Sequence, residues 1–312
     1  MNLSLKTLIS SYQKSSDCAK ILFFISLLFI IVTYFKNKKI EGFESGNDSK
    51  FQFKQKSVEI YDKFYSNIYD QLVFSRSKTD FEVSEIKKLT NPNSKNVILD
   101  IGSGTGHHVA KLSSINNTEI VGIDNSSSMI KKAKKNYPSL NFEVKDVSDG
   151  NIFMSNTFTH ILCLYFTVYY FKDKEKLFIN CMRWLKPGGY MIIHLIDKSN
   201  FDPIVPPSNP LYVVSPQKYS KKRLTKSKVT FNNFIYESNF KTDVENNVSI
   251  FEEKFIKKDN SSVRKHEHKL YIEDKEVTAR IAQDVGFIIQ GVVNLVNCGY
   301  DNQYLYVFVK PQ

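Results

Sequence analysis

A glycine-rich turn between an apolar run and the start of an amphipathic run constrains this chain more than any other feature. Residues 96–110 read Asn-Val-Ile-Leu-Asp-Ile-Gly-Ser-Gly-Thr-Gly-His-His-Val-Ala. Val97–Asp100 is typical of a short buried strand, and the apolar positions from Val109 onward indicate a helix. Three glycines between them let the backbone turn tightly and approach a ligand at the helix N-terminus; they are Gly102, Gly104 and Gly106.

The spacing of the glycines and the next acidic residue indicate what the turn binds. A dinucleotide fingerprint has the spacing Gly-x-Gly-x-x-Gly, whereas this turn has Gly-x-Gly-x-Gly and is preceded by Asp100. Glu119–Asp124 reads as a second strand that ends in an acid. A carboxylate at that point is placed to accept hydrogen bonds from two ribose hydroxyls. Asn125–Ser127 then supplies residues that cap the following helix.

Strand-like and helical runs continue to alternate after the second strand. The further predicted strands are Asn141–Val144, Phe158–Leu164, Tyr190–Ile196, Phe287–Val296 and Gln303–Val309. The sequence Leu-Lys-Pro-Gly-Gly at 185–189 predicts a sharp turn before the fifth strand. The last two strands form a closing hairpin-like pair, so the pattern predicts a doubly wound α/β domain.

Taken together, these motifs resemble the class I S-adenosylmethionine-dependent methyltransferases, with a methyltransferase type 11/25-like domain. The resemblance is continuous over about residues 95–197 and looser toward the C-terminus. It implies a Rossmann-like seven-stranded sheet whose last strand is antiparallel. It also implies S-adenosyl-L-methionine as the cofactor and an in-line transfer of its methyl group, for which the cofactor supplies the reactive chemistry.

The resemblance implies a role for each matching position around the cofactor. The glycine turn would face the methionine and ribose portions, with Asp100 supporting the loop, and Asp124 would hold the ribose hydroxyls. Asp146 would bond the adenine amino group, with Val147 beside the ring and Met129 on its other side. The chain departs from the family in having Thr159 after Phe158, where an acid is frequent, and in lacking Asn/Asp-Pro-Pro-Tyr after the fourth strand. The second departure argues against methylation of a planar exocyclic amine.

The C-terminal half carries the features expected to meet the acceptor. Residues 211–272 are predicted to be a β-rich insertion with strand-like runs at Val229–Tyr236, Val248–Phe255 and Val263–Ile272. Insertions at this position commonly form a substrate lid in the family that the chain resembles. An aromatic stripe at helical spacing, comprising Tyr61, Tyr65 and Tyr69, is predicted to close the opposite side and contact substrate. Core packing is the alternative explanation of the stripe.

Candidates for accepting a proton from a hydroxyl nucleophile lie near the ends of the fourth and fifth strands. They are His194, Tyr165 and either Tyr169 or Tyr170, although strand packing explains any one of them more often than catalysis does. His266 and His268 share one face of a strand and have the spacing of metal ligands. Zinc sites need a third ligand and no third ligand is indicated, so no metal is predicted.

An uncharged run near the N-terminus, Ile21–Phe35, predicts a single transmembrane helix over residues 18–36. A cleaved signal peptide and a buried core helix are the alternatives; the lysines that follow the run and the lack of a small-residue cleavage site favour an uncleaved anchor. The predicted order is a tail (1–17), the anchor, a linker (37–50) and a methyltransferase domain (51–312). The protein would then be a single-pass membrane protein with its catalytic domain on the cytoplasmic side.

Composition narrows the function only a little. The net charge is +11, and residues 51–312 keep +8 of it, which permits RNA or acidic lipid as a partner without indicating either. The four cysteines are scattered and fit a reducing compartment. The sequence predicts a membrane-anchored methyltransferase acting on a small molecule, lipid or protein. An RNA methyltransferase and a catalytically inactive, membrane-anchored cofactor-binding scaffold are the alternatives.

Overall fold

The chain divides into two units, Met1–Ile40 and Glu41–Gln312, in the computed structural model. The structure describes residues 16–36, 51–92, 95–115, 118–204, 216–243, 245–259 and 261–312. The first unit contains one described helix, α2 (Asp17–Lys36), with side chains described as far as Leu27. The predicted tail lies almost entirely outside the described residues, and the predicted linker lies wholly outside them.

Helix α2 corresponds to the predicted membrane anchor. Among its side chains described as far as Leu27, Ile21 is 59%, Leu22 64% and Phe24 61% exposed. Within the described part of the chain, no helix combines the length and the apolar character needed to cross a membrane. The predicted span over residues 18–36 therefore lacks support from the structure.

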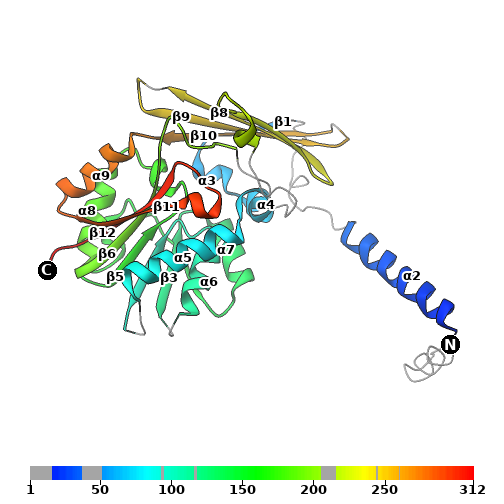
Figure 1. Ribbon diagram of the computed structural model, residues 1–312, viewed down its shortest axis with the longest axis horizontal. Helices are drawn as coiled ribbons and strands as arrows, with labels where there is room; N and C mark the ends of the chain where they lie inside the picture. Colours follow the sequence, from blue (N-terminus) through cyan, green and yellow to red (C-terminus); the bar gives the residue numbers. More distant parts are fainter. Residues whose placement is uncertain are drawn as a thin grey trace. The chain divides into compact units, whose positions relative to one another are not determined.

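The second unit is built on a seven-stranded mixed sheet (Figure 1). In spatial order its strands are β11 (Ile288–Asn294), β12 (Gln303–Val309), β6 (Leu185–Ile196), β5 (Phe158–Cys163), β2 (Val97–Ile101), β3 (Glu119–Asp124) and β4 (Asn141–Val144). The strands from β6 to β4 are mutually parallel, whereas β12 is antiparallel to both of its neighbours. This confirms the predicted doubly wound sheet with an antiparallel last strand.

Helices bury both faces of this sheet. Helices α5 (Arg76–Thr90), α6 (His107–Ser113) and α7 (Ser127–Asn136) contribute to one apolar core, and α8 (Lys174–Trp184) and α9 (Lys275–Asp284) contribute to another. Side-chain caps start several of them, because Ser75, Ser126 and Asp173 each accept a hydrogen bond from the backbone N–H three residues later. The sheet and its helices thus hold the carboxyl ends of β2, β3 and β4 at one edge.

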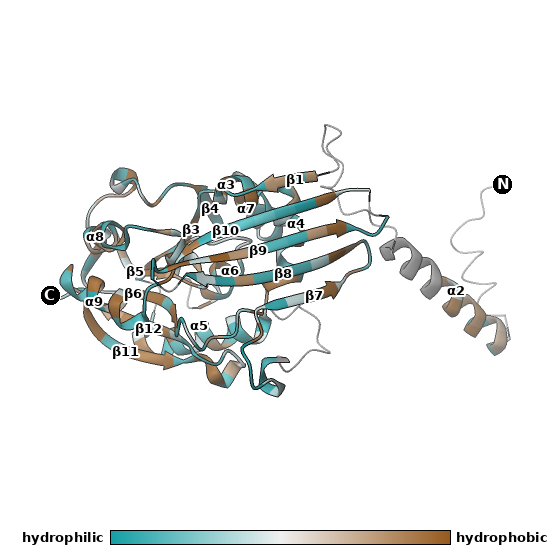
Figure 2. Ribbon diagram, turned by 90° about the horizontal axis from the view of Figure 1, so that it is seen from above, coloured by the Kyte–Doolittle hydropathy of each residue, from teal (hydrophilic) through white to brown (hydrophobic). Residues whose placement is uncertain are grey.

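A second sheet of five strands lies over that edge (Figure 1; Figure 2). Its order is β1 (Phe51–Lys54), β10 (Val263–Tyr271), β9 (Val248–Lys257), β8 (Phe234–Asp243) and β7 (Lys226–Thr230). β1 pairs in parallel with β10, and the remaining pairs are antiparallel. The single run predicted at Val229–Tyr236 is wrong, because the chain reverses there, between β7 and β8.

The segment between the two sheets also differs from the expectation of one continuous helix. It forms α3 (Ser57–Ile60) and α4 (Lys63–Val73), and the break falls at Tyr61 and Asp62. Asp62 adopts an extended backbone and accepts a hydrogen bond from Tyr65 N, which starts a new helix. β6 likewise begins at Leu185, inside the predicted turn. Four 3₁₀ turns complete the described elements: η1 (Gly150–Ile152), η2 (Thr167–Tyr170), η3 (Pro216–Tyr219) and η4 (Leu295–Cys298).

Candidate active site

The glycine turn after β2 requires glycine at two positions for packing as well as for backbone conformation. Gly102, Gly104 and Gly106 have positive φ angles of +69°, +55° and +91°. A Cβ on Gly102 would lie 2.6 Å from the Thr167 side chain, and one on Gly106 would lie 2.6 Å from the Phe142 ring. A Cβ on Gly104 would meet only the Tyr69 ring, at 3.8 Å. The turn is therefore tightly packed at its ends and open at its centre.

Asp124 joins the end of β3 to this turn. Its carboxylate accepts hydrogen bonds from Gly104 N at 3.1 Å and from Ser126 N at 2.8 Å. Burial raises the pKa of Asp124 to about 6, although both backbone hydrogen bonds oppose the shift. A carboxylate offers about four acceptor positions, so Asp124 keeps the capacity to bind two further hydroxyls. The structure brings together the turn and the acid that sequence reasoning assigned to one ligand.

The other predicted cofactor residues surround the same strand ends. Asp100 is buried at the end of β2, and burial raises its pKa to about 7. Met129 and Val147 are buried, whereas Asp146 is exposed and accepts a hydrogen bond from Ser148 N at 2.9 Å. A cavity of about 320 Å³ opens beside Val147. Its lining residues are Val147, Ser148, Tyr170, Phe171, Lys172, Asp173, Lys176 and Leu177.

Two of the three predicted proton acceptors lie in the core. His194 is fully buried; its Nδ1 donates to the Tyr165 carbonyl at 2.5 Å and its Nε2 lies 3.0 Å from Gln303 Oε1. Burial lowers the pKa of His194 to about 4. Tyr169 is also fully buried, and its hydroxyl accepts a hydrogen bond from Ile196 N at 2.9 Å. The contacts of His194 and Tyr169 are those of residues that hold the fold.

Tyr165 differs from these two. It is partly exposed, follows the end of β5 and has a φ of +54°. A bulky residue with positive φ is a true backbone outlier, and such conformations cost of order 1–3 kcal/mol. The surrounding contacts, which include the rings of Phe166 and His194, must hold Tyr165 in this conformation.

A buried ion cluster lies beside the Tyr165 ring. The ammonium group of Lys78 forms an ion pair with Glu82 within α5, and His108 Nε2 lies 2.9 Å from the other oxygen of Glu82. Lys78 Nζ also lies 5.1 Å from the centre of the Tyr165 ring and 5.3 Å from that of Tyr300. Burial alone would raise the pKa of Glu82, but Lys78 and His108 lower it to about 2. Sequence reasoning missed this cluster, since the helix that carries Lys78 and Glu82 was not predicted.

The predicted substrate tyrosines gather between the glycine turn and the five-stranded sheet. The Tyr61 ring centre lies 5.2 Å from that of Tyr65 and 6.2 Å from that of Tyr69. Tyr65 is buried, whereas Tyr61 and Tyr69 are partly exposed. Ser126 Oγ donates to the Tyr61 carbonyl at 2.5 Å, so the group adjoins the Asp124 loop. Burial raises the pKa of all three phenols well above the ordinary value and keeps them neutral at physiological pH.

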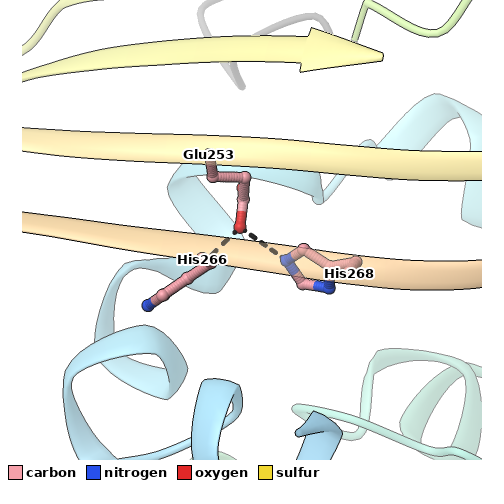
Figure 3. Close-up of side chains that lie close together, drawn as sticks. All are labelled: Glu253, His266 and His268. Atoms are coloured by element: carbon pink, nitrogen blue, oxygen red, sulfur yellow. Dashed lines mark hydrogen bonds and ion pairs between the residues drawn. The ribbon is translucent and has the colours of Figure 1, made fainter. Parts of the chain in front are cut away.

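The five-stranded sheet contributes an acidic residue that sequence reasoning did not identify. Glu253 on β9 lies opposite His266 on β10 in the strand register. Its Oε2 lies 2.8 Å from His268 Nε2 and 3.4 Å from His266 Nδ1 (Figure 3). One side-chain atom from each of the three residues lies within 4.8 Å of the others, which is close enough for all three to bind one metal ion. The only sequence signal for Glu253 was its inward position on a predicted strand.

Comparison with known proteins shows that the segment with the glycine turn is similar to methyltransferase domains. A family model described as a methyltransferase domain matches residues 98–189. A putative methyltransferase of Invertebrate iridescent virus 6 is 32% identical over 101 residues, which cover 32% of this chain and 37% of that protein. Phosphoethanolamine N-methyltransferase 1 of Zea mays is 27% identical over 173 residues, which cover 50% of this chain and 31% of that protein. The chain thus spans about a third of the length of these curated relatives.

A solved structure extends the fold comparison beyond the family match. The S-adenosylmethionine-bound structure of CalS10, an amino pentose methyltransferase from Micromonospora echinaspora, has a TM-score of 0.57 and 16% identity. The alignment covers 79% of this chain and 96% of that chain. The two chains therefore share a fold that reaches well outside residues 98–189.

Proposed function

Since this chain contains a class I S-adenosylmethionine-dependent methyltransferase domain, we propose that it transfers the cofactor's methyl group to a small-molecule acceptor. The observation that carries the proposal is the hydrogen bonding of Asp124 to the glycine turn, beside tyrosines that the five-stranded sheet covers. Phosphoethanolamine N-methyltransferases among the relatives support an acceptor of this size.

The residues present fit the cofactor. Asp124 retains acceptor capacity for the two ribose hydroxyls, and the open centre of the turn at Gly104 leaves space for a ligand beside the backbone. Val147 borders a cavity where the adenine would bind, with Met129 buried at the start of α7. S-adenosylmethionine, when bound, supplies an electrophilic methyl group on a sulfonium. The protein's own contribution is to align the acceptor with that methyl and to exclude water.

The enclosure of the tyrosines supports a small acceptor over a macromolecular one. Tyr65 donates to Glu253 on β9 at 3.0 Å, so α4 is hydrogen-bonded directly to the covering sheet. Tyr170 on η2 is likewise bonded to His268 on β10, at 2.7 Å. These contacts pack α4 and η2 against the five-stranded sheet around the tyrosines, an arrangement that suits a small-molecule acceptor better than a folded RNA or protein.

Transfer of labelled methyl groups tests the proposal. The full chain is incubated with S-[methyl-¹⁴C]adenosylmethionine and a cell extract, and the products are separated into small molecules, lipid, protein and RNA. We expect label in the small-molecule fraction, and none when Asp124→Ala replaces the native chain. Label confined to RNA or protein would contradict the proposed acceptor class. Cofactor binding without any labelled product would favour a scaffold.

Cofactor affinity should depend on pH through Asp124. Only its ionised carboxylate accepts hydrogen bonds with full strength, and its pKa is raised to about 6 in the free protein. Affinity should be constant above about pH 7 and fall up to about tenfold per pH unit below about pH 6. Isothermal titration calorimetry across this range measures the slope. Asp124→Asn should flatten it, and an equally steep slope in that variant would assign the titration to another group.

We also propose that residues 18–36 attach the chain to a membrane, with the catalytic unit on the cytoplasmic side. The support is the apolar sequence of the segment and the exposure of Ile21, Leu22 and Phe24. Fractionation of cells that express the full chain or a chain lacking residues 1–50 tests it. We expect the full chain to stay with the membrane pellet after alkaline carbonate extraction. Release of the full chain into the supernatant would contradict the proposal.

A further inference from the structure

The buried face of the five-stranded sheet carries a cluster of polar side chains, although a buried sheet face is ordinarily apolar. Alternate residues of β10 point inward, as the burial pattern of the strand shows. Buried polar side chains from three adjacent strands meet on this face; they are Arg264, His266, His268, Glu253, Tyr236 and Ser238. Buried polar groups on this scale are retained only when they are hydrogen-bonded to one another.

Glu253 lies at the centre of the cluster and is fully hydrogen-bonded. Its Oε1 accepts from Tyr65 OH at 3.0 Å and from Tyr236 OH at 2.8 Å, and its Oε2 accepts from the two histidines. Burial alone would raise its pKa, but the hydrogen bonds from His266 and His268 hold the pKa of Glu253 well below its ordinary value. Two acceptor positions on each oxygen are thus used, and the carboxylate is charged.

The contact with Arg264 determines which nitrogen of His266 carries the proton. Arg264 Nε donates to His266 Nε2 at 2.6 Å, and a guanidinium has no acceptor. His266 Nε2 must therefore be the unprotonated nitrogen, and Nδ1–H points to Glu253. A metal ion in this cluster would need that Nδ1 lone pair and would place two N–H donors, from Arg264 and His266, against each other. The arrangement favours a hydrogen-bond network over a metal centre.

The same reasoning determines which ring nitrogen of His268 carries the proton. Its Nε2–H donates to Glu253, so its Nδ1 is an acceptor, and Tyr170 OH must donate to it across 2.7 Å. The Tyr170 oxygen then accepts from Tyr61 OH, at 2.8 Å. The hydroxyls form a chain in which every proton points toward His268. The Tyr61 oxygen is the outer end, with a lone pair to accept a proton from a donor.

Tyr61, the outer end of this chain of hydroxyls, lies beside the loop that carries Asp124 and Ser126. Tyr61 is partly exposed, and its carbonyl is bonded to Ser126, two residues after Asp124. Tyr69, which packs against the Tyr61 ring, is the side chain nearest to the open centre of the turn at Gly104. A nucleophile placed between the turn and Tyr61 would have the chain of hydroxyls within reach.

We propose that Tyr61 and Tyr170 conduct the proton of the methyl acceptor to His268, which Glu253 holds in orientation. The proposal rests on the proposed function and specifies its substrate class as an alcohol, phenol or amine that loses a proton on methylation. The acceptor's lone pair forms the bond to the methyl carbon, and the electron pair of the broken S–CH₃ bond stays on sulfur. The acceptor's proton moves to Tyr61, the Tyr61 proton to Tyr170, and the Tyr170 proton to His268 Nδ1. Reversal through the same chain returns that proton to water after product release.

Electrostatics around His268 suit this role. The groups that face it are Glu253 from β9, His266 from β10, Tyr65 and Tyr61 from the α3–α4 segment, and Tyr170 from η2. Glu253 is the one charged group among them. An imidazolium at His268 would be paired with that carboxylate at 2.8 Å, which offsets the cost of placing a positive charge in a buried position.

Nuclear magnetic resonance of the full chain labelled with ¹⁵N-histidine tests the hydrogen-bond direction without any acceptor. The resonances that are missing from the spectrum of His268→Gln are assigned to His268. We expect His268 to carry its proton on Nε2, and Tyr170→Phe to shift its Nδ1 resonance because the donor is lost. Tyr219→Phe, a change at a tyrosine that is 83% exposed, is the control and should leave the spectrum unchanged. A proton on Nδ1, or stoichiometric uptake of Zn²⁺ that Glu253→Gln abolishes, would overturn the proposal.

Methyl transfer to two probes tests the function of the chain of hydroxyls. Phosphoethanolamine loses a proton on methylation, whereas the carboxylates of trans-aconitate carry none at neutral pH. For a protic acceptor we expect His268→Gln and Tyr170→Phe to lower kcat by about 100-fold or more, with the acid limb of the pH–rate profile altered and cofactor affinity unchanged. Robust methylation of trans-aconitate, unaffected by His268→Gln, would contradict the proposal. If the native chain did not bind the cofactor, the proposed function would be refuted instead. The resonance experiment would still decide the direction of the hydrogen bonds.

Discussion

Asp124→Ala is expected to raise the dissociation constant for S-adenosylmethionine by at least about 100-fold. The variant removes a half-buried carboxylate that would accept hydrogen bonds from two ribose hydroxyls. A hydrogen bond to a charged group contributes about 1.5–3 kcal/mol, and about 1.4 kcal/mol corresponds to a factor of ten in affinity. The loss also leaves Gly104 N and Ser126 N without their partner, so the turn itself loses its attachment to β3. Calorimetric titration of the full chain measures the change.

Asp149→Ala is the matched control for that variant. Asp149 is an exposed aspartate after β4 whose carboxylate accepts a hydrogen bond from Asn151 N at 2.9 Å, so it also stabilises a turn. Its removal should leave the affinity within about twofold, since surface changes of this kind are usually within about 0.5 kcal/mol. Equal losses in the two variants would show that turn stability, and not a ribose contact, controls binding.

Lys78→Met is expected to lower the free energy of unfolding by about 3–5 kcal/mol, because removing one partner of a buried ion pair leaves a buried charge uncompensated. Glu82 would keep only His108 as its partner. Chemical denaturation of the full chain measures the loss. Lys88→Met, at an exposed lysine paired with Glu85 on the same helix, is the control, and should cost less than about 1 kcal/mol. Similar losses of unfolding free energy in both variants would show that the buried ion pair contributes no more than the exposed one.

The pH dependence of stability gives a second readout for this cluster. The folded-state pKa of Glu82, about 2, lies below its ordinary value of 4.5. A carboxyl group with a lowered pKa contributes stability above its unfolded pKa, and that contribution is lost as the pH falls through the folded pKa. The native chain should therefore lose stability between about pH 4.5 and about pH 2. Lys78→Met should lose much less in that window, and an unchanged acid loss would assign it to other carboxylates.

The cofactor side of the site was predictable because its signals are local in sequence. The glycine turn immediately follows its strand, and Asp124 ends the next strand. Parallel strands bring their carboxyl ends to one edge of the sheet, so the topology follows once the strands are recognised. The three glycines and Asp124 were predicted in this way to share one site, and the structure places Asp124 against the turn; their contact with the cofactor stays a prediction.

The proposed acceptor side depends on contacts between residues that are distant in sequence. Glu253 reaches His266 and His268 only through the register of β9 against β10, and a shift by one residue would turn it to the other sheet face. Tyr61 leaves the helical register because Asp62 caps a new helix, a local competition that the aromatic spacing concealed. His194 was misleading for the opposite reason, since a histidine at a strand end is equally compatible with the core.

The position of β1 in the five-stranded sheet bears on how the chain can be shortened. Residues 51–54 pair with β10 in parallel, and Lys54 lies opposite His266. Removal of these four residues would expose the backbone N–H and C=O groups of β10 along an uncovered edge. Such an edge can pair with the same strand of another copy, so the shortened protein would be prone to self-association and to a displaced His266. A shortened chain for solution work should therefore retain Phe51.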